Sequence, residues 1–465
     1  MNNLSLTPRA IRFRRFSGKA YAAFCSMHRE VTIGRVCARI ANLELLKAGR
    51  SVLLCAAAFV GGIMYADEPQ EREEIPLDIS QLSLSEVQVV AQRAEVQSAS
   101  YRLIHTLSAV EIAELPVRTV SDLLRYVPGL DVRSRGAKGS QADVSMRGGT
   151  FDQVLVMING VNLTDAHTGH YSLNLPIDVS LIERIEILQG TSASLFGLNA
   201  FSGAINIITK QQSPTEGHKL YARMTAGTNE LLNPAFSARV NKGDWYLNTS
   251  VDYTHSNGYS APRPTDKEKI ALANTDLEVA NVYLQTGYNK VHSYLDIQAG
   301  AQYKDAGAGM YYGFGSQDQF DATRTVFGSA NYTHMWGAFS LDAQAMYRAN
   351  YDRYEWHRGQ RLYGNFHFAQ NAAANIRAHY ASKIGRTTIG LEVRNENIHS
   401  TNLGDTVHAD GQVPNVEGFN KNDVQVLNLV KGCNRLNVNY FAEQSFFWNG
   451  LSAYPETGIR CMVIT

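Results

Sequence analysis

The sequence predicts a mainly β protein, in which a mixed α/β domain precedes an antiparallel β-barrel that crosses a membrane. Three observations lead to this prediction. A short apolar run follows a basic N-terminal segment, residues 86–210 mix helical and strand patterns, and residues beyond 218 alternate apolar with polar side chains. The formal net charge of the 465 residues is zero, and no nucleic-acid partner is expected.

Residues 1–66 are interpreted as a leader. The first 50 residues hold ten Lys and Arg against two acidic residues, and the uncharged run 51–64 follows them. With Ala66 as the small residue at the cleavage point, this is the pattern of a secretory signal. The run is too short to span a bilayer as a helix, and a buried core helix is the alternative. Only two cysteines remain beyond the leader, without CxxC spacing, so neither a zinc site nor a disulfide framework is indicated.

Residues 67–85 are acidic and polar, which predicts a flexible segment. A helix is predicted at 119–127, where apolar residues recur at helical spacing. Thr119 and Asp122 supply a start signal, and Pro128-Gly129 ends the helix. The apolar strand 154–158 leads into Asn159-Gly160, which is a strong hairpin signal.

Residues 181–210 read as two strands joined by a glycine-rich link. In the first strand Ile185 and Ile187 alternate with Arg184 and Glu186. The glycines at 190, 197 and 203 indicate close approach of the backbone to its surroundings. The stretch has neither a nucleophile-elbow nor a phosphate-loop motif, so a catalytic loop is not predicted.

Beyond residue 218 the links between the amphipathic strands alternate in length. Short links are predicted near 243–244, 289–290, 334–335 and 382–385, and long ones near 255–275, 304–322, 351–371 and 398–433. In an up-and-down barrel every second link lies at the same end, so this alternation is typical of an outer-membrane barrel. A soluble antiparallel sandwich, the alternative, has no reason to alternate its loop lengths.

Residues 86–210 resemble the plug domain of TonB-dependent outer-membrane receptors. The resemblance rests on "VSDLLRYVPGLDV" (120–132), "DVSMRGGTFDQVLVMINGVNL" (143–163) and the "IERIEI…G…LFG…GAINIITK" pattern within 181–210. It implies a plug at 94–211 and a transmembrane barrel at 212–445. Residues 446–465 lose the strand pattern, which suggests a truncated or frame-shifted ending near Ser452.

The resemblance implies a barrel of 22 strands, whereas the sequence shows about ten. A plug of this size is roughly 35 Å across. Ten strands close at roughly 20 Å and 22 strands at roughly 44 Å. The barrel is therefore expected to be incomplete, since ten strands cannot enclose the plug.

Residues 86–93, "EVQVVAQR", resemble the Ton box of this family. The resemblance implies that the segment adds as a strand to TonB, which couples the receptor to an energising complex in the inner membrane. The alternative is that it forms the first strand of the plug. The residues expected to bind TonB are Glu86, Val87, Gln88, Val89, Val90 and Ala91.

The resemblance also implies that apical plug loops bind substrate. The matching candidates are Arg135, Lys138, Gln141, His167, His170, Tyr171 and Asn174, and ordinary solvated loop residues are the alternative. No metal site is predicted at the two histidines, because no set of carboxylates or cysteines lies near them in sequence. Contact between plug and barrel is expected from Arg147, Arg184 and Glu186, where Arg147 matches the arginine of the plug motif. An ordinary surface salt bridge would contribute little.

The predicted function is energy-coupled uptake of a scarce large solute across the bacterial outer membrane. A cobalamin-type corrinoid is favoured, and an iron-siderophore chelate is the alternative. The partners expected are TonB, the solute and outer-membrane lipid, with the receptor acting as a monomer and without a cofactor. An outer-membrane enzyme or a passive porin would need neither plug nor Ton box. A non-functional receptor fragment remains compatible with the resemblance.

Overall fold

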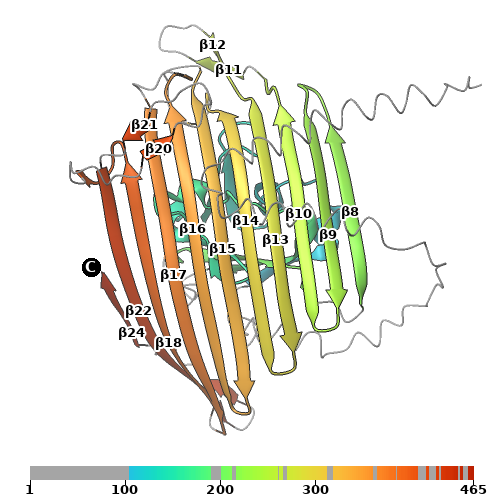
Figure 1. The fold of residues 1–465 in the computed structure, drawn as a ribbon, viewed down its shortest axis with the longest axis vertical. Helices are drawn as coiled ribbons and strands as arrows, with labels where there is room; N and C mark the ends of the chain where they lie inside the picture. The colour runs from blue at the N-terminus through green and yellow to red at the C-terminus, as the bar shows by residue number, and fades with distance from the viewer. Residues whose placement is uncertain are drawn as a thin grey trace, which may run out of the picture. The chain divides into compact units, whose positions relative to one another are not determined.

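The computed structural model describes residues 104–189, 200–211, 216–259, 261–264, 270–309, 311, 318–359, 364–383, 385–406, 415–417, 426–428, 431–448, 451–453 and 459–464. The expected leader, the acidic segment 67–85 and the Ton box-like segment 86–93 lie outside these residues. So do the glycines at 190 and 197. The described residues form a plug domain and a long antiparallel sheet within one compact unit (Figure 1).

The plug domain contains a five-stranded sheet in the order β1-β6-β7-β4-β5 and a separate β2-β3 hairpin. Strands β4 and β7 run parallel, and the other neighbours are antiparallel. Its elements are β1 (Ile104–Ser108), α4 (Ala109–Glu114), α5 (Val120–Leu124), β2 (Leu130–Ser134), β3 (Ala142–Met146), the 3₁₀ turn η4 (Phe151–Gln153), β4 (Val154–Ile158), β5 (Val161–Asn162), the 3₁₀ turns η5 (Gly169–Tyr171) and η6 (Val179–Leu181), β6 (Ile182–Gln189) and β7 (Gly203–Thr209).

The predicted helix and the predicted hairpin of the plug are both present, and the helix is shorter than expected. Helix α5 begins after Thr119, whose Oγ1 accepts the N–H of Asp122 at 3.1 Å. The helix ends at Leu124, before the expected residue 127, and Gly129 follows with a φ of +83°. Asn159 and Gly160 both have positive φ and join β4 to β5, as the hairpin signal predicts.

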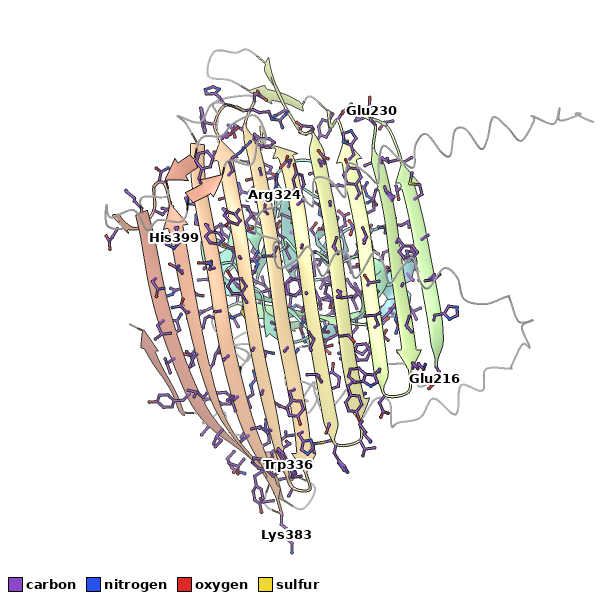
Figure 2. All side chains as sticks on the ribbon, viewed as in Figure 1. Glu216, Glu230, Arg324, Trp336, Lys383 and His399 are labelled. Atoms are coloured by element: carbon purple, nitrogen blue, oxygen red, sulfur yellow. The ribbon has the colours of Figure 1, made fainter. Side chains whose placement is uncertain are left out.

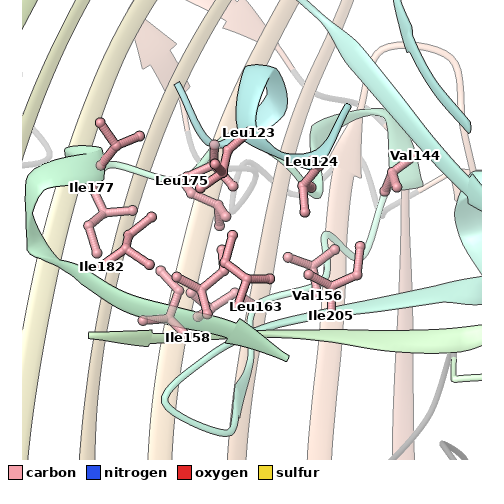
Figure 3. Close-up of a cluster of buried hydrophobic side chains, with 14 of the residues drawn as sticks. Leu123, Leu124, Val144, Val156, Ile158, Leu163, Leu175, Ile177, Ile182 and Ile205 are labelled. Carbon is pink, nitrogen blue, oxygen red and sulfur yellow. The ribbon is translucent and has the colours of Figure 1, made fainter. Parts of the chain in front are cut away.

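One apolar cluster holds the plug together. Leu123 and Leu124 of α5 face Val156 and Ile158 of β4 and Ile205 of β7, and Figure 3 shows how these side chains converge. Val156 belongs to the same cluster. Full burial of one such side chain stabilises the fold by about 1.5–3 kcal/mol.

The strands on either side of residues 190–199 form an antiparallel pair, as predicted. Ile187 of β6 lies opposite Ile205 of β7, and Leu188 lies opposite Ala204. A Cβ atom on Gly203 would lie 2.5 Å from the carbonyl oxygen of Leu188 and 2.1 Å from Sδ of Met146. The expected close approach is therefore confirmed at Gly203.

A thirteen-stranded antiparallel sheet follows the plug, and we call it the wall. Ten of its described strands are long, which matches the predicted number, and its described path is open rather than closed into a ring. The elements after the plug are β8 (Gly217–Ala226), β9 (Leu232–Lys242), β10 (Trp245–Ser256), β11 (Ala261–Pro264), β12 (Ile270–Ala273), β13 (Leu277–Lys290), β14 (Ser293–Gly307), β15 (Phe320–Trp336), β16 (Phe339–Glu355), β17 (Gly364–Ser382), β18 (Gly385–Ser400), β19 (Asp405–Thr406), β20 (Asn415–Glu417), β21 (Val426–Asn428), β22 (Lys431–Trp448), β23 (Leu451–Ala453) and β24 (Ile459–Ile464).

The two ends of the wall differ as the link lengths predict. Tight turns join β9 to β10, β13 to β14, β15 to β16 and β17 to β18, while longer links lie at the opposite end (Figure 1). The link between β8 and β9, residues 227–231, is the short exception at the long-link end. Strand β22 continues past residue 445, and β23 and β24 pair with it.

The two faces of the wall differ in chemistry. Exposed aromatic residues gather toward the tight-turn end, among them Trp245, Trp336 and Phe339 (Figure 2). The plug-facing side carries buried polar residues instead, such as Arg348, Asn350 and Asp352 on β16. An apolar outer face with aromatic girdles and a polar interior is the pattern of outer-membrane barrels.

Among the described residues, no helix combines the length and the apolar character needed to cross a membrane.

Candidate functional site

The plug segment 158–174 lies against the inner face of the wall. Four wall side chains donate hydrogen bonds to carbonyl oxygens of every second residue in its first part. The bonds join Gln298 to Ile158 (3.4 Å), Gln344 to Gly160 (3.3 Å), Arg394 to Asn162 (3.3 Å) and Asn371 to Thr164 (2.6 Å). The wall therefore holds the plug backbone at these points.

A buried ion pair adds to this contact. Arg348 Nη1 of β16 lies 2.7 Å from Asp165 Oδ2 of the plug, and both side chains are almost fully buried. Arg348 Nη2 also donates to the carbonyl oxygen of Tyr171 at 3.1 Å. Asp165 Oδ1 accepts the backbone N–H of His167 at 2.8 Å, so the same carboxylate shapes the plug loop.

Two of the predicted substrate residues are buried against the wall. The Tyr171 hydroxyl donates to Asp321 Oδ1 of β15 at 3.2 Å. Asn174 Oδ1 accepts from Lys304 Nζ of β14 at 2.5 Å, and Asn174 Nδ2 donates to Thr323 Oγ1 at 3.3 Å. In this arrangement Tyr171 and Asn174 bind the wall, and plug movement would have to break these bonds before either side chain contacts a solute.

Three other predicted residues meet at Asp143 of β3. Arg135 Nε lies 2.6 Å from Asp143 Oδ2, while His170 Nδ1 lies 2.6 Å and Gln141 Nε2 3.2 Å from Oδ1. Burial alone would raise the pKa of Asp143. The hydrogen bonds from His170 and Arg135 outweigh burial, and the pKa lies below its usual value.

This arrangement predicts a specific acid sensitivity. Because the pKa of Asp143 is lower in the folded chain, its interactions contribute stability that is complete above the ordinary pKa of about 3.9. That stability is lost as the pH falls below this value toward the folded pKa. We expect Asp143→Asn to flatten the decline of the urea midpoint between pH 5 and pH 3. Equal slopes for the variant and the original chain would contradict this assignment.

Of the two remaining candidates, Lys138 is exposed, and His167 is described below. Tyr311, in the link between β14 and β15, closes over the same plug loop. Its carbonyl oxygen accepts from Arg135 Nη1 at 2.9 Å, and its hydroxyl accepts the N–H of Gln141 at 3.1 Å. Sequence patterns did not identify Tyr311, since it lies in a long link without periodicity.

A pocket of about 520 Å³ opens on the plug beside these residues. Arg133, Arg135 and Arg147 line it together with Asp131 and Asp143. Its size lies within the range of small-molecule sites. Three guanidinium groups suit a solute that carries anionic or amide oxygens.

The plug loop also brings His167 to two wall residues. His167 Nδ1 lies 3.7 Å from Asp352 Oδ2 of β16, and the rings of His167 and His367 of β17 have centroids 4.0 Å apart. Burial lowers the pKa of His167. The wall therefore brings a carboxylate and a further histidine to His167, although the nearby sequence has neither.

The residues expected to join plug and barrel behave differently from one another. Arg147 is exposed, with a φ of +52°, and lines the pocket. Arg184 Nε lies 2.7 Å from Glu186 Oε1 on the same strand, and Glu186 Oε2 accepts from Asn206 of β7. The ion pair and the hydrogen bond of these two residues thus lie within the plug. The wall residues described above, such as Arg348 and Arg394, make the contacts between plug and wall.

Comparison with known proteins identifies the plug. Residues 97–204 match the TonB-dependent Receptor Plug Domain family. The chain is 31% identical over 217 residues to the vitamin B12 transporter BtuB of Vibrio cholerae, which covers 46% of this chain and 33% of that protein. It is 37% identical over 203 residues to the BtuB of Vibrio vulnificus strain YJ016, covering 39% and 33% of the two chains. The matches thus span about a third of the length of these relatives.

Solved structures show the same fold at low sequence identity. The ferric enterobactin receptor of Pseudomonas aeruginosa superimposes with a TM-score of 0.61 and 15% identity, covering 80% of this chain and 58% of the receptor. The copper transporter OprC superimposes with a TM-score of 0.58 and 14% identity, covering 75% and 53%. The plug, the wall of ten long strands and the inward polar face together make this an outer-membrane protein. Residues 97–204 are thus a plug domain of the TonB-dependent receptor type, and the chain shares the fold of the solved receptors named above.

Proposed function

We propose that the receptor takes up a scarce large solute and that TonB supplies the energy through movement of the plug. The observation that carries this proposal is a plug that many polar contacts hold to the wall, while only a few apolar wall residues, Tyr283, Phe327 and Met346, join its core. These polar contacts include hydrogen bonds to the backbone of residues 158–164 and the ion pairs Arg348–Asp165 and Arg223–Asp178. Such contacts exchange readily for water, whereas a buried apolar interface of similar size would resist separation.

A cobalamin-type corrinoid is the solute that the sequence relatives favour, because two vitamin B12 transporters match this chain at 31% identity over 217 residues and 37% over 203 residues. A ferric siderophore is the second candidate, since the ferric enterobactin receptor shares the fold. The arginine-lined pocket fits either one, because both kinds of solute present oxygen acceptors. An enzymatic activity is not part of this proposal.

The test measures uptake by a completed receptor. By this we mean a protein in which further barrel strands follow this chain, so that the barrel can close around the plug. Host cells that lack their own cobalamin receptor should accumulate radiolabelled cyanocobalamin only when both the receptor and TonB are present. Binding to isolated outer membranes should persist without TonB, and a ferric catecholate siderophore should not compete for it. Competition by the siderophore would reverse the order of the two candidates. Uptake without TonB would contradict energised transport.

A further inference from the structure

Three side chains from distant parts of the sequence meet where the plug loop touches the wall. One nitrogen or carboxylate oxygen from each of His167, Asp352 and His367 lies within 4.8 Å of those of the other two. Asp352 is near the end of β16 and His367 near the start of β17, beside a long link. In outer-membrane barrels the long links face the cell exterior. The cluster does not depend on which solute the receptor takes up.

The register of the wall sets two of the three residues side by side. Asp352 lies directly opposite His367 in the β16–β17 ladder, so both side chains leave the same face of the sheet. The paired Cβ atoms of such neighbours are about 4.5–5.5 Å apart. Ser400 of β18 lies opposite His367 on its other side. His167 then reaches this row from the plug.

The spacing within the cluster fits an ion better than a hydrogen bond. The 3.7 Å between His167 Nδ1 and Asp352 Oδ2 is longer than a hydrogen bond. Two ligands about 2.1 Å from one tetrahedral ion lie about 3.4 Å apart. A small adjustment of the side chains would therefore bring the two atoms to ligand spacing.

Two atoms of the cluster lack hydrogen-bond partners among the described residues. They are His167 Nδ1 and Asp352 Oδ1, and both are buried. An unpaired carboxylate oxygen in a buried site is costly unless a cation or a donor satisfies it. The guanidinium of Arg348, on the same strand as Asp352, is already paired with Asp165. The cluster thus offers one carboxyl group and two imidazoles to an incoming cation.

The second ring nitrogen of His367 is held by its own partner. His367 Nδ1 lies 2.8 Å from Ser400 Oγ, which leaves Nε2 to face the cluster. Ser400 Oγ also accepts the backbone N–H groups of Asn402 and Leu403 at 2.9 and 2.8 Å. Ser400 is therefore fixed in place and orients the imidazole, as the outer partners of metal-binding histidines do.

We propose that His167, Asp352 and His367 bind one divalent transition-metal ion between the plug loop and the wall. Two imidazoles and a carboxylate suit zinc and neighbouring ions such as cobalt(II), nickel(II) and copper(II) rather than calcium or magnesium. Three protein ligands leave a fourth position open for water or for a donor atom of a solute.

The ion would connect the plug to two strands of the wall. His167 belongs to the loop that Asp165 and Arg348 hold in place, and the other two ligands belong to β16 and β17. A bound ion would therefore restrain residues 165–171 directly. Its loss would free this loop without removing the ion pair beside it.

The first experiment uses the full chain, purified in detergent and stripped of metal with a chelator. Zinc titrated against a chromophoric competitor should bind with one equivalent. His167→Gln, Asp352→Asn and His367→Gln should each weaken that binding at least tenfold, and Ser400→Ala should weaken it about 10–100-fold. His399→Gln is the matched control. His399 lies opposite Phe368, one register position away, and points to the other face of the wall.

A second experiment begins with a measurement on the original chain alone. Cobalt(II) added to the original chain should give the intense visible absorption of a four-coordinate site, and zinc should displace it. Zinc should also slow hydrogen exchange of residues 165–171 in the original chain and in His399→Gln, but not in His367→Gln. Absence of cobalt bands, or zinc binding that all three ligand variants retain, would overturn the proposal.

Discussion

Replacing Arg348 by methionine is expected to lower the free energy of unfolding by about 3–5 kcal/mol, because it leaves the Asp165 carboxylate buried without its partner. The two charged groups lie 2.7 Å apart with side chains 3% and 1% exposed. The same change also removes the hydrogen bond to the carbonyl oxygen of Tyr171. Urea titration of the chain in detergent, followed by circular dichroism, measures the loss.

Two further variants separate the charge effect from the loss of packing. Arg348→Met combined with Asp165→Asn removes both charges, and the neutral amide keeps an oxygen for the N–H of His167. This double variant should be more stable than Arg348→Met alone. Arg133→Met is the matched control, since its pair with Asp131 is exposed to solvent and should contribute little. A loss below about 1 kcal/mol for Arg348→Met would show that water already screens the pair.

The wall could be predicted from sequence because successive side chains of a strand point to opposite faces of the sheet. A half-buried strand therefore alternates apolar and polar residues. Phe339 and Tyr347 point outward on β16, while Arg348 is buried on the plug side. The order of short and long links follows from the same pattern. A hairpin such as β4-β5 is equally local, since Asn159 and Gly160 alone favour its backbone angles.

The contacts between plug and wall could not be predicted in the same way. Four wall side chains bind backbone carbonyl oxygens of residues 158–164. Because every residue has a backbone carbonyl, the plug sequence does not show which residues are bound. Arg184 and Glu186 had the side chains expected of a contact, yet their recorded ion pair is with each other. The meeting of His167 with Asp352 and His367 depends on the register of β16 and β17 and on where the plug lies. Neither the register of these strands nor the position of the plug can be predicted from residue spacing along the chain.

Deletion of residues 86–93 is expected to reduce energised uptake by a completed receptor to the level seen without TonB, while solute binding stays unchanged. The segment carries three valines, Val87, Val89 and Val90, and strand addition draws its affinity from main-chain hydrogen bonds. Under the proposed function, TonB could then no longer move the plug, although the candidate binding residues at 135–174 remain. Uptake of labelled cobalamin and its binding to isolated outer membranes are the two measurements.

The control is deletion of residues 67–74, "DEPQEREE", which removes the same number of residues from the adjoining acidic segment. Uptake should survive this change, since the segment lacks the apolar alternation of a strand. Val89→Pro tests the main-chain contribution directly, because proline has no N–H to donate to a neighbouring strand. Val89→Pro should therefore reduce energised uptake, as the deletion of residues 86–93 does. If uptake persists after both Val89→Pro and the deletion of 86–93, the segment is the first strand of the plug rather than the TonB contact, and the energy must enter the receptor elsewhere.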